Sequence, residues 1–258
     1  PAEYMAAVLS NNMNEINQVT IFMKECKRMG VKVLGPDVNE SLYKFTVNEY
    51  NAIRFGIGAI KGGGKGAVDT IIENRKEALY KNIFDVVKKV DLRAANKKAM
   101  ENLALAGGFD SFAGTHRAQY FNPDGDGIIF LEKIIRFGSK FQENQNSSQT
   151  SLFGGDTDQV YQELVIPQAP EWNNLRQLKK EREVVGIYIS GHPLDDFKKE
   201  IKWFTNADLS QLKDLKPWIN KNLSLAGIIN DFQHLESRSG KGWGWFTFCL
   251  LYTSDAAD

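Results

Sequence analysis

The stretch IRFGIGAIKGGGKGAVDTIIENR, Ile53 to Arg75, contains a glycine-rich turn followed by a predicted helix, and the rest of the chain is best understood from it. Three consecutive glycines, Gly62 to Gly64, precede residues 67–72, whose apolar side chains fall on one face of a helix. Glycines at a helix start let the backbone approach a ligand, and unpaired amides and the helix dipole favour an anion there. Lys61 and Lys65 flank the glycines, and we call residues 61–65 the first glycine turn. We expect a nucleic-acid phosphate as its ligand.

Other phosphate-binding loops do not fit this spacing. A Walker loop needs GxxxxGK followed by Ser or Thr, and no window of the chain has that pattern. A dinucleotide fingerprint needs a buried strand before the glycines and an acidic residue about twenty positions later, and the local pattern offers neither. A helix-hairpin-helix, in which Gly62 to Gly64 form the hairpin and hold the sugar-phosphate backbone without reading sequence, fits better. A flexible loop between helices is the open alternative.

A second glycine turn follows the same order of elements. Residues 96–106, NKKAMENLALA, predict a helix that ends at Gly107 and Gly108, and a further helix is predicted near Arg117. Two such units in tandem straddle a duplex, so the repeat favours DNA as the ligand. Candidate phosphate contacts are Lys97, Lys98, His116 and Arg117, and a solvated surface role stays open for each.

Composition places the chain among ordinary globular proteins. Its 258 residues are 42% hydrophobic and 25% charged, and this length suggests more than one domain. The formal net charge is zero, so a DNA-binding surface has to be local. The chain has no apolar run of membrane-spanning length, no signal-peptide pattern, and too few cysteines for a disulfide framework. These features predict a cytoplasmic protein that does not bind membranes.

Both ends of the chain are expected to be cut. The sequence begins at Pro1, without an initiator Met, directly in a helix-like segment. At the other end, CLLYTSDAAD, residues 249–258, does not continue the preceding strand pattern. Its reverse translation looks like a transposon adapter used to build sequencing libraries. We interpret residues 249–258 as a sequencing-adapter artefact and exclude them from fold reasoning.

Local patterns predict a mainly α fold with small β elements, an α+β protein. Alternation over Leu42–Val47 and Ile53–Phe55 predicts a β-hairpin before the first glycine turn. Leu223–Ile229 and Trp243–Phe248 alternate similarly and predict the first strands of an incomplete oligonucleotide-binding barrel, with aromatic residues for base stacking. Further helices are predicted at residues 14–29, 83–90, 128–137 and 172–188, and Cys26 on the first of these is predicted to be a core residue.

Residues 122–127, NPDGDG, resemble the start of a calcium-binding loop. With Asp124 and Asp126 at loop positions three and five, Gly127 falls correctly at six, but position twelve is Lys133 in place of the bidentate Glu. A Pro/Gly turn before a helix is therefore the favoured interpretation, with calcium binding as the alternative.

The polar residues 141–150, FQENQNSSQT, predict an unstructured linker. Gln149, Leu152 and Phe153 follow at its end, and an exposed Leu-Phe pair is costly unless a partner covers it. A Gln three residues before a Leu-Phe pair is the pattern of a peptide that docks into a ring-shaped sliding clamp. Packing of this pair on the chain's own domain is the open alternative.

Four motifs occur in an order that resembles one family. FGIGAIKGGG (55–64), LALAGGFDS (103–111), QTSLF (149–153) and EREVVGIYISGHPLDDF (181–197) together resemble the bacterial DNA polymerase III alpha subunits, the C-family replicative polymerases. The resemblance covers residues 1–248 and implies a fragment from the end of the fingers domain through the start of the OB fold. Its implied parts are the C-terminal part of the fingers (1–55), a tandem helix-hairpin-helix and clamp-binding region (56–140), a flexible linker with the clamp motif (141–170), a helical connector (171–215) and a truncated OB fold (216–248).

The resemblance implies a DNA-directed DNA polymerase that synthesises DNA from dNTPs on a primed template. The fragment would grip product duplex and tether the enzyme to the sliding clamp, the beta subunit, beside other replicase holoenzyme subunits. Implied DNA contacts are Lys61, Gly62, Gly63, Gly64, Lys65, Gly107, Gly108 and Arg117, and implied clamp contacts are Gln149, Leu152 and Phe153.

The parent enzymes use Mg²⁺ held on palm-domain carboxylates, for which the sequence offers no counterpart. No catalytic residue, metal or cofactor is therefore expected in the fragment. One position departs from the family, because Gly63 stands where an apolar residue is common, and we expect this to loosen the first hairpin. A stand-alone helix-hairpin-helix DNA-binding or scaffold protein is the competing hypothesis, and the choice between a main replicase and an error-prone paralogue stays open.

Overall fold

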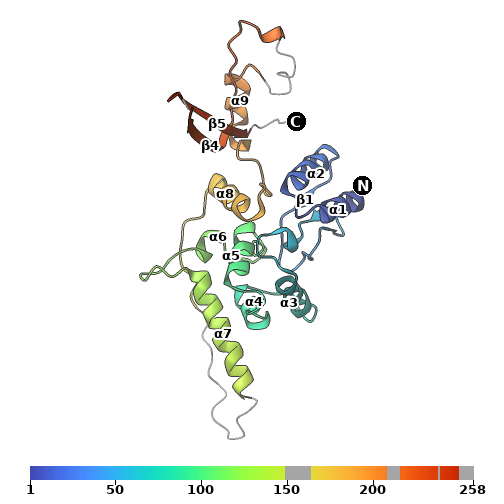
Figure 1. Ribbon diagram of the computed structural model, residues 1–258. Helices are drawn as coiled ribbons and strands as arrows, with labels where there is room; N and C mark the ends of the chain where they lie inside the picture. The colour runs from blue at the N-terminus through green and yellow to red at the C-terminus, as the bar shows by residue number, and fades with distance from the viewer. Residues whose placement is uncertain (149–163, 208–215, 238, 250–258) are drawn as a thin grey trace. The chain divides into compact units, whose positions relative to one another are not determined.

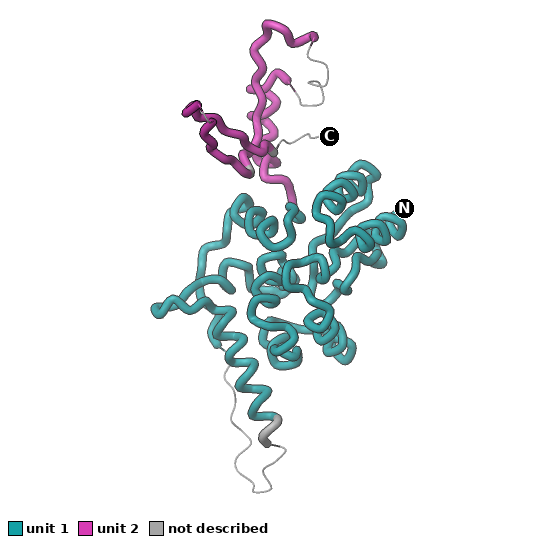
Figure 2. The backbone as a smooth tube through the Cα atoms, in the orientation of Figure 1, with its two compact units in different colours: residues 1–190 teal, residues 191–258 magenta. Residues whose placement is uncertain are grey.

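The structure is a computed structural model that describes residues 1–148, 164–207, 216–237 and 239–249. It is mainly helical with two small sheets, which confirms the predicted α+β class (Figure 1). The chain divides into two compact units, residues 1–190 and 191–258 (Figure 2). This boundary falls inside the predicted connector 171–215, so the connector is not one structural element.

Unit 1 begins with two helices that contact a small sheet. The helices are α1 (Ala2–Asn11) and α2 (Ile16–Arg28), and the sheet has the order β1 (Val33–Leu34), β3 (Ile53–Arg54), β2 (Thr46–Val47). Strand β1 runs parallel to β3, whereas β2 runs antiparallel to it, as the predicted hairpin requires. Cys26 on α2 is fully buried, as predicted for a core residue, and burial raises the pKa of its thiol.

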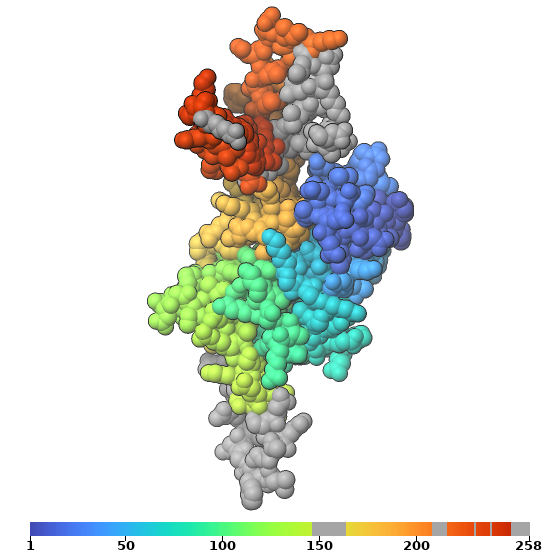
Figure 3. Space-filling view, in the orientation of Figure 1, coloured from blue at the N-terminus to red at the C-terminus, as the bar shows by residue number. Residues whose placement is uncertain are grey.

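The sheet leads into the helices that carry both glycine turns. A single 3-10 turn, η1 (Ile57–Ala59), comes before the first glycine turn. It is followed by α3 (Lys65–Arg75), α4 (Ile83–Lys89), α5 (Lys97–Ala106), α6 (Arg117–Tyr120), α7 (Phe130–Ser148) and α8 (Asn174–Val185). The side chains of Asn82 and Asn96 accept bonds from backbone amides in the first turns of α4 and α5, which fixes where these helices begin. Figure 3 shows the cyan and green segments that carry α3 to α7 packed into one continuous body.

Helix α7 is longer than the sequence predicts. The predicted linker starts at residue 141, whereas α7 continues to Ser148. Packing against α4 explains the difference, because Gln142 donates to the Val87 and Val90 carbonyl oxygens at 2.8 and 2.9 Å. Carbonyls at the end of a helix have no intrahelical partner. A polar residue of α7 therefore makes a tertiary contact there, and the helix extends beyond its apolar repeat.

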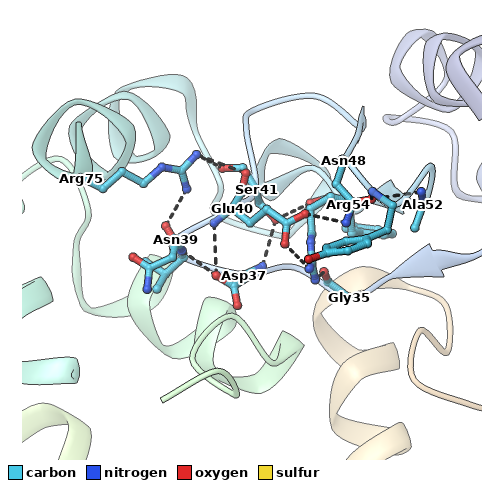
Figure 4. Close-up of polar contacts among 12 residues, drawn as sticks. Gly35, Asp37, Asn39, Glu40, Ser41, Asn48, Ala52, Arg54 and Arg75 are labelled. Carbon is cyan, nitrogen blue, oxygen red and sulfur yellow. Dashed lines mark hydrogen bonds and ion pairs between the residues drawn. The ribbon is translucent and has the colours of Figure 1, made fainter. Parts of the chain in front are cut away.

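Polar side chains fasten α3 to the loop that follows β1 (Figure 4). Arg75, at the end of α3, donates to the Ser41 carbonyl oxygen at 2.7 Å. Glu40 pairs with Arg54 and accepts a bond from Asn48 at 3.0 Å. Burial disfavours the charged form of Glu40, but the bonds from Arg54 and Asn48 outweigh it and hold the pKa of this carboxyl below its usual value. The network fixes the direction of α3, whose first residue ends the first glycine turn.

The described part of unit 2 contains short helices and one β-hairpin. The helices are η2 (Asp195–Phe197), α9 (Lys198–Phe204) and η4 (Lys216–Trp218), and β4 (Ile228–Glu236) pairs antiparallel with β5 (Gly242–Cys249). The strand predicted at Leu223–Ile229 begins only at Ile228 and runs on to Glu236, whereas the second strand agrees with its prediction. Closure into a barrel stays a prediction. None of the helices in the described ranges is both long and apolar enough to cross a bilayer.

Candidate nucleic-acid interface

The first glycine turn lies on the surface at the start of α3. Gly62 has φ +81°, a left-handed conformation that suits glycine, and it is exposed together with Lys61, Gly64 and Lys65. Gly63 is half-buried, and a Cβ at this position would lie 2.2 Å from the Ile57 carbonyl oxygen. The turn therefore closes tightly against η1 because position 63 has no side chain, which differs from the expectation that Gly63 loosens the first hairpin.

The start of α3 carries unpaired backbone donors. Gly64 is the N-cap residue and offers no side chain to cap the helix. Because the first amides of a helix have no intrahelical partner, those of the exposed Lys65 and Gly66 are left for solvent or a ligand. Together with the positive end of the helix dipole, they suit an anionic oxygen. This is the local geometry that the phosphate prediction requires, and the contact with phosphate itself stays a prediction.

Three hydrogen bonds attach Lys61 to helices α5 and α8. Its carbonyl oxygen accepts a bond from the Asn102 side chain on α5 at 2.6 Å, and its amide donates to the Val184 carbonyl on α8 at 2.9 Å. Its ammonium donates to the Glu183 carbonyl at 2.8 Å. The Lys61 side chain thus covers the carbonyl end of α8. Lys65 makes no side-chain contact of this kind with any residue that the structure describes, so its charge is the one available to a ligand at this turn.

The first turn of α5 borders the same surface. A Cβ on Gly62 would lie 3.6 Å from the Ala99 Cα, so the glycine turn rests against the beginning of this helix. Lys98 is exposed there and remains a candidate phosphate contact. Lys97, in contrast, is ion-paired with Glu132, and hydrogen bonds from Lys97 and Arg136 hold the pKa of the Glu132 carboxyl below its usual value.

The second glycine turn is buried and ends α5. Gly107 has φ +94°, and the amides of Gly107 and Gly108 donate to the carbonyls of Ala104 (3.1 Å) and Leu103 (2.8 Å). This pair of bonds is a Schellman motif, which uses up both amides. The prediction that Gly107 and Gly108 contact DNA directly is therefore wrong for this structure. The exposed part of the turn comes later, at Ser111, Ala113 and Gly114.

Arg117 also requires a correction, because it is only 6% exposed. Its guanidinium donates to the Asp110 carboxylate at 2.6 and 2.9 Å and to the Glu181 carboxylate at 2.8 Å. Burial disfavours the charge, but the hydrogen bonds and charges of Asp110 and Glu181 outweigh it and raise the pKa of Arg117 above its usual value. A guanidinium held on two sides by carboxylates has no free edge for a phosphate, so Arg117 serves the fold.

The other sequence candidates have local roles or lie outside the described residues. Asp124 accepts bonds from the amides of Asp126 and Ile128, each at 2.9 Å, and pairs with Lys133. The Lys133 bond is the main cause that lowers the pKa of Asp124. No cluster of three or more His, Cys, Asp or Glu side chains able to hold a metal occurs among the described residues. Gln149, Leu152 and Phe153 lie outside the described residues.

The contribution of α8 is not apparent from sequence spacing. From positions far along the chain, Glu183 and Val184 contact Lys61 of the first turn, and Glu181 contacts Arg117 on α6. One signal was present, because Leu178, Glu181 and Val184 fall on the same buried helical face. An acidic residue on an apolar stripe indicates a buried partner of opposite charge.

Comparisons with known proteins agree with the arrangement of turns. A family model described as a helix-hairpin-helix motif matches residues 30–120, which contain both glycine turns. The DNA polymerase III alpha subunit of Vibrio cholerae is 35% identical over 249 residues, which are 96% of this chain and 21% of the relative. That of Pasteurella multocida is 33% identical over 247 residues, 95% of this chain and 20% of the relative. That of Escherichia coli strain K12 is 35% identical over 234 residues, 89% of this chain and 19% of the relative.

The chain is similar to DNA polymerase III alpha subunits over 89–96% of its own length. It spans about a fifth of the length of these relatives. The family resemblance drawn from the order of four motifs is thereby confirmed. Within this chain, the helix-hairpin-helix match covers the first glycine turn, the start of α5 and the buried second turn.

Proposed function

We propose that this chain is the part of a replicative DNA polymerase that holds duplex DNA by its phosphate backbone. The observation that carries the proposal is the exposed first glycine turn, with the uncapped start of α3 and the unpaired Lys65 beside it. Amides and lysine ammonium groups bind phosphate oxygens in any sequence, so the grip is indifferent to base identity. Lys98, at the adjacent start of α5, is the second cation of this surface.

The charge of the chain sets the expected strength of this grip. Its formal net charge is zero, so the attraction comes from a few local contacts and not from a general basic field. Affinity for duplex DNA is therefore weak and falls as salt rises, because each neutralised phosphate releases counterions. Titration of two unrelated duplex sequences tests the proposal, with equal affinities expected. A clear preference for one sequence would point to base readout instead.

We place the chemistry of DNA synthesis in the remainder of the polymerase, in the cytoplasm. The reaction would join dNTPs to a primed template with Mg²⁺ held by carboxylates, and the described residues bring no such group together. This chain alone is therefore expected to show no template-directed incorporation in a primer-extension assay with Mg²⁺. Incorporation by the purified chain would place catalytic residues inside it.

We further propose that Gln149, Leu152 and Phe153 attach the polymerase to its sliding clamp, next to other holoenzyme subunits. The support is the sequence pattern, a Leu-Phe pair in a polar segment preceded by Gln. Burial of the two apolar side chains is worth roughly 3–6 kcal/mol before ordering costs. Binding of an isolated peptide is accordingly expected at about micromolar strength.

The clamp proposal is tested in the full-length polymerase. Replacement of both Leu152 and Phe153 by Ala is expected to abolish clamp binding and to shorten processive synthesis, because tethering no longer adds to the DNA contacts. Single-nucleotide incorporation should remain intact. Undiminished clamp affinity of the double variant would place the contact elsewhere.

A further inference from the structure

We propose that the C-terminal end of α8 is a positioning element for the DNA-binding surface, with Lys61 and Glu181 as its positioning residues. The inference rests on the proposed grip of duplex DNA by the first glycine turn. It assigns Lys61 a different role from Lys65, because Lys61 holds the turn in place whereas Lys65 contacts phosphate. It also makes the first glycine turn dependent on α8, which lies more than a hundred positions later in the chain.

The first link joins α8 to the first glycine turn. The last turn of α8 presents the carbonyl oxygens of Glu183 and Val184, which have no partner within the helix. Lys61 satisfies both, through its ammonium at 2.8 Å and its amide at 2.9 Å. An ammonium bonded to the negative end of a helix is favourably placed by the dipole and is drawn away from a ligand. Asn102 fixes the Lys61 carbonyl from the other side at 2.6 Å.

The second link joins α8 to the loop of the second turn. Glu181 has no exposed surface, and its carboxylate accepts four bonds: from Arg117 and the Ser190 hydroxyl at 2.8 Å, and from the Ser190 and Ile189 amides at 3.0 and 3.1 Å. Arg117 continues the link by donating to Asp110, the residue before the exposed loop 111–114. Helix α8 thus contacts the first glycine turn directly and reaches the second turn through Arg117.

Bracing matters because the proposed ligand contacts are backbone amides. The conformation of a turn fixes where its backbone N–H bonds point. A turn that fluctuates therefore spends less time with these donors in the geometry that binds phosphate. Loss of the brace should lower affinity without removing a phosphate contact. Loss of Lys65, in contrast, should remove one contact and reduce the salt dependence of binding by about one unit.

The test measures duplex affinity of the full 258-residue chain over a salt series. Lys61→Met removes the ammonium but keeps the stem, and it is expected to weaken binding roughly fivefold with an unchanged salt slope. Lys61→Arg restores a donor to the Glu183 carbonyl and should recover much of the loss. Glu183→Gln is the matched control, because it changes the side chain and leaves the carbonyl that Lys61 contacts.

Glu181→Gln tests the second link, since the amide keeps the shape of the carboxylate and loses its charge and half of its acceptors. It should weaken binding with an unchanged salt slope at a temperature where circular dichroism shows a folded chain. Lys61 is exposed, so Lys61→Met is expected to fold. This variant therefore tests the proposal even if Glu181→Gln does not fold. Wild-type affinity of Lys61→Met, or a loss of salt slope equal to that of Lys65→Gln, would overturn the positioning role. If Lys65→Gln leaves affinity and slope unchanged, the proposed DNA grip fails instead.

Discussion

At the scale of single residues, Glu181 shows how a buried charge is made tolerable. A carboxylate taken out of water costs several kcal/mol unless it is paired and hydrogen-bonded. Glu181 has an arginine, a hydroxyl and two backbone amides around it, so its acceptor sites are filled. Removal of Arg117 would leave the Glu181 carboxylate without its countercharge, and removal of the Ser190 hydroxyl would leave one of its acceptor sites unfilled.

Gly107 depends on the same cluster. Its φ of +94° disfavours a side chain, and a Cβ would lie 2.3 Å from the Arg117 Nη2 atom. Gly107→Ala is therefore expected to lower the free energy of unfolding by roughly 1–3 kcal/mol or more, through backbone strain and displacement of the guanidinium. Urea unfolding with circular dichroism measures the change.

Gly66→Ala supplies the control for this prediction. Gly66 lies in α3 with a negative φ, and a Cβ there meets no atom within 4 Å. Alanine favours a helix by about 0.5–1 kcal/mol over glycine, so this variant should be as stable as the wild type or more so. Equal stabilities of Gly107→Ala and the wild type would show that Arg117 is not held where the structure places it.

At the scale of elements, the positions of the first glycine turn and its helices could be predicted from the sequence. The tertiary hydrogen bonds that hold the turn in place could not. The spacing of apolar residues at 67–72 and the pattern of residues 96–106 are local signals, and α3 and α5 lie where those signals place helices. The bond between Lys61 and Glu183 spans 122 positions, and no local pattern encodes it. The end of α5 at Gly107 was a local signal as well, but the burial of Gly107 and Gly108 was not, so these glycines looked like ligand contacts.

The network around Glu40 makes the attachment of α3 dependent on pH. The folded-state pKa of Glu40 lies below its value in the unfolded chain, about 4.3. Its contribution to stability is therefore full above that value and is lost as pH falls through the lower folded-state pKa. Glu40→Gln should destabilise the chain at neutral pH, and its difference from the wild type should shrink below about pH 4. Urea unfolding at several pH values measures this, and a constant difference would mean that the Glu40 charge contributes nothing.

At the scale of the whole molecule, a chain without net charge is expected to bind DNA only through a small surface. The described cations of unit 1 are largely used within the fold, as Arg75, Lys97, Arg117 and Lys133 show. Lys65 and Lys98 stand apart because they flank exposed helix starts and face no acidic partner in the described ranges. The grip on duplex DNA is accordingly expected to rest on few phosphate contacts.

The most direct test of this account is the salt dependence of duplex binding by Lys65→Gln. Fluorescence anisotropy with two unrelated duplexes should show weaker binding of this variant to both, and a slope of log affinity against log salt that is smaller by about one unit. Lys76→Gln, at the other end of α3 and more than half exposed, removes the same charge about 16 Å away and should leave the slope unchanged. A Lys65→Gln slope equal to that of the wild type would contradict the assignment of the first glycine turn as the DNA-binding site.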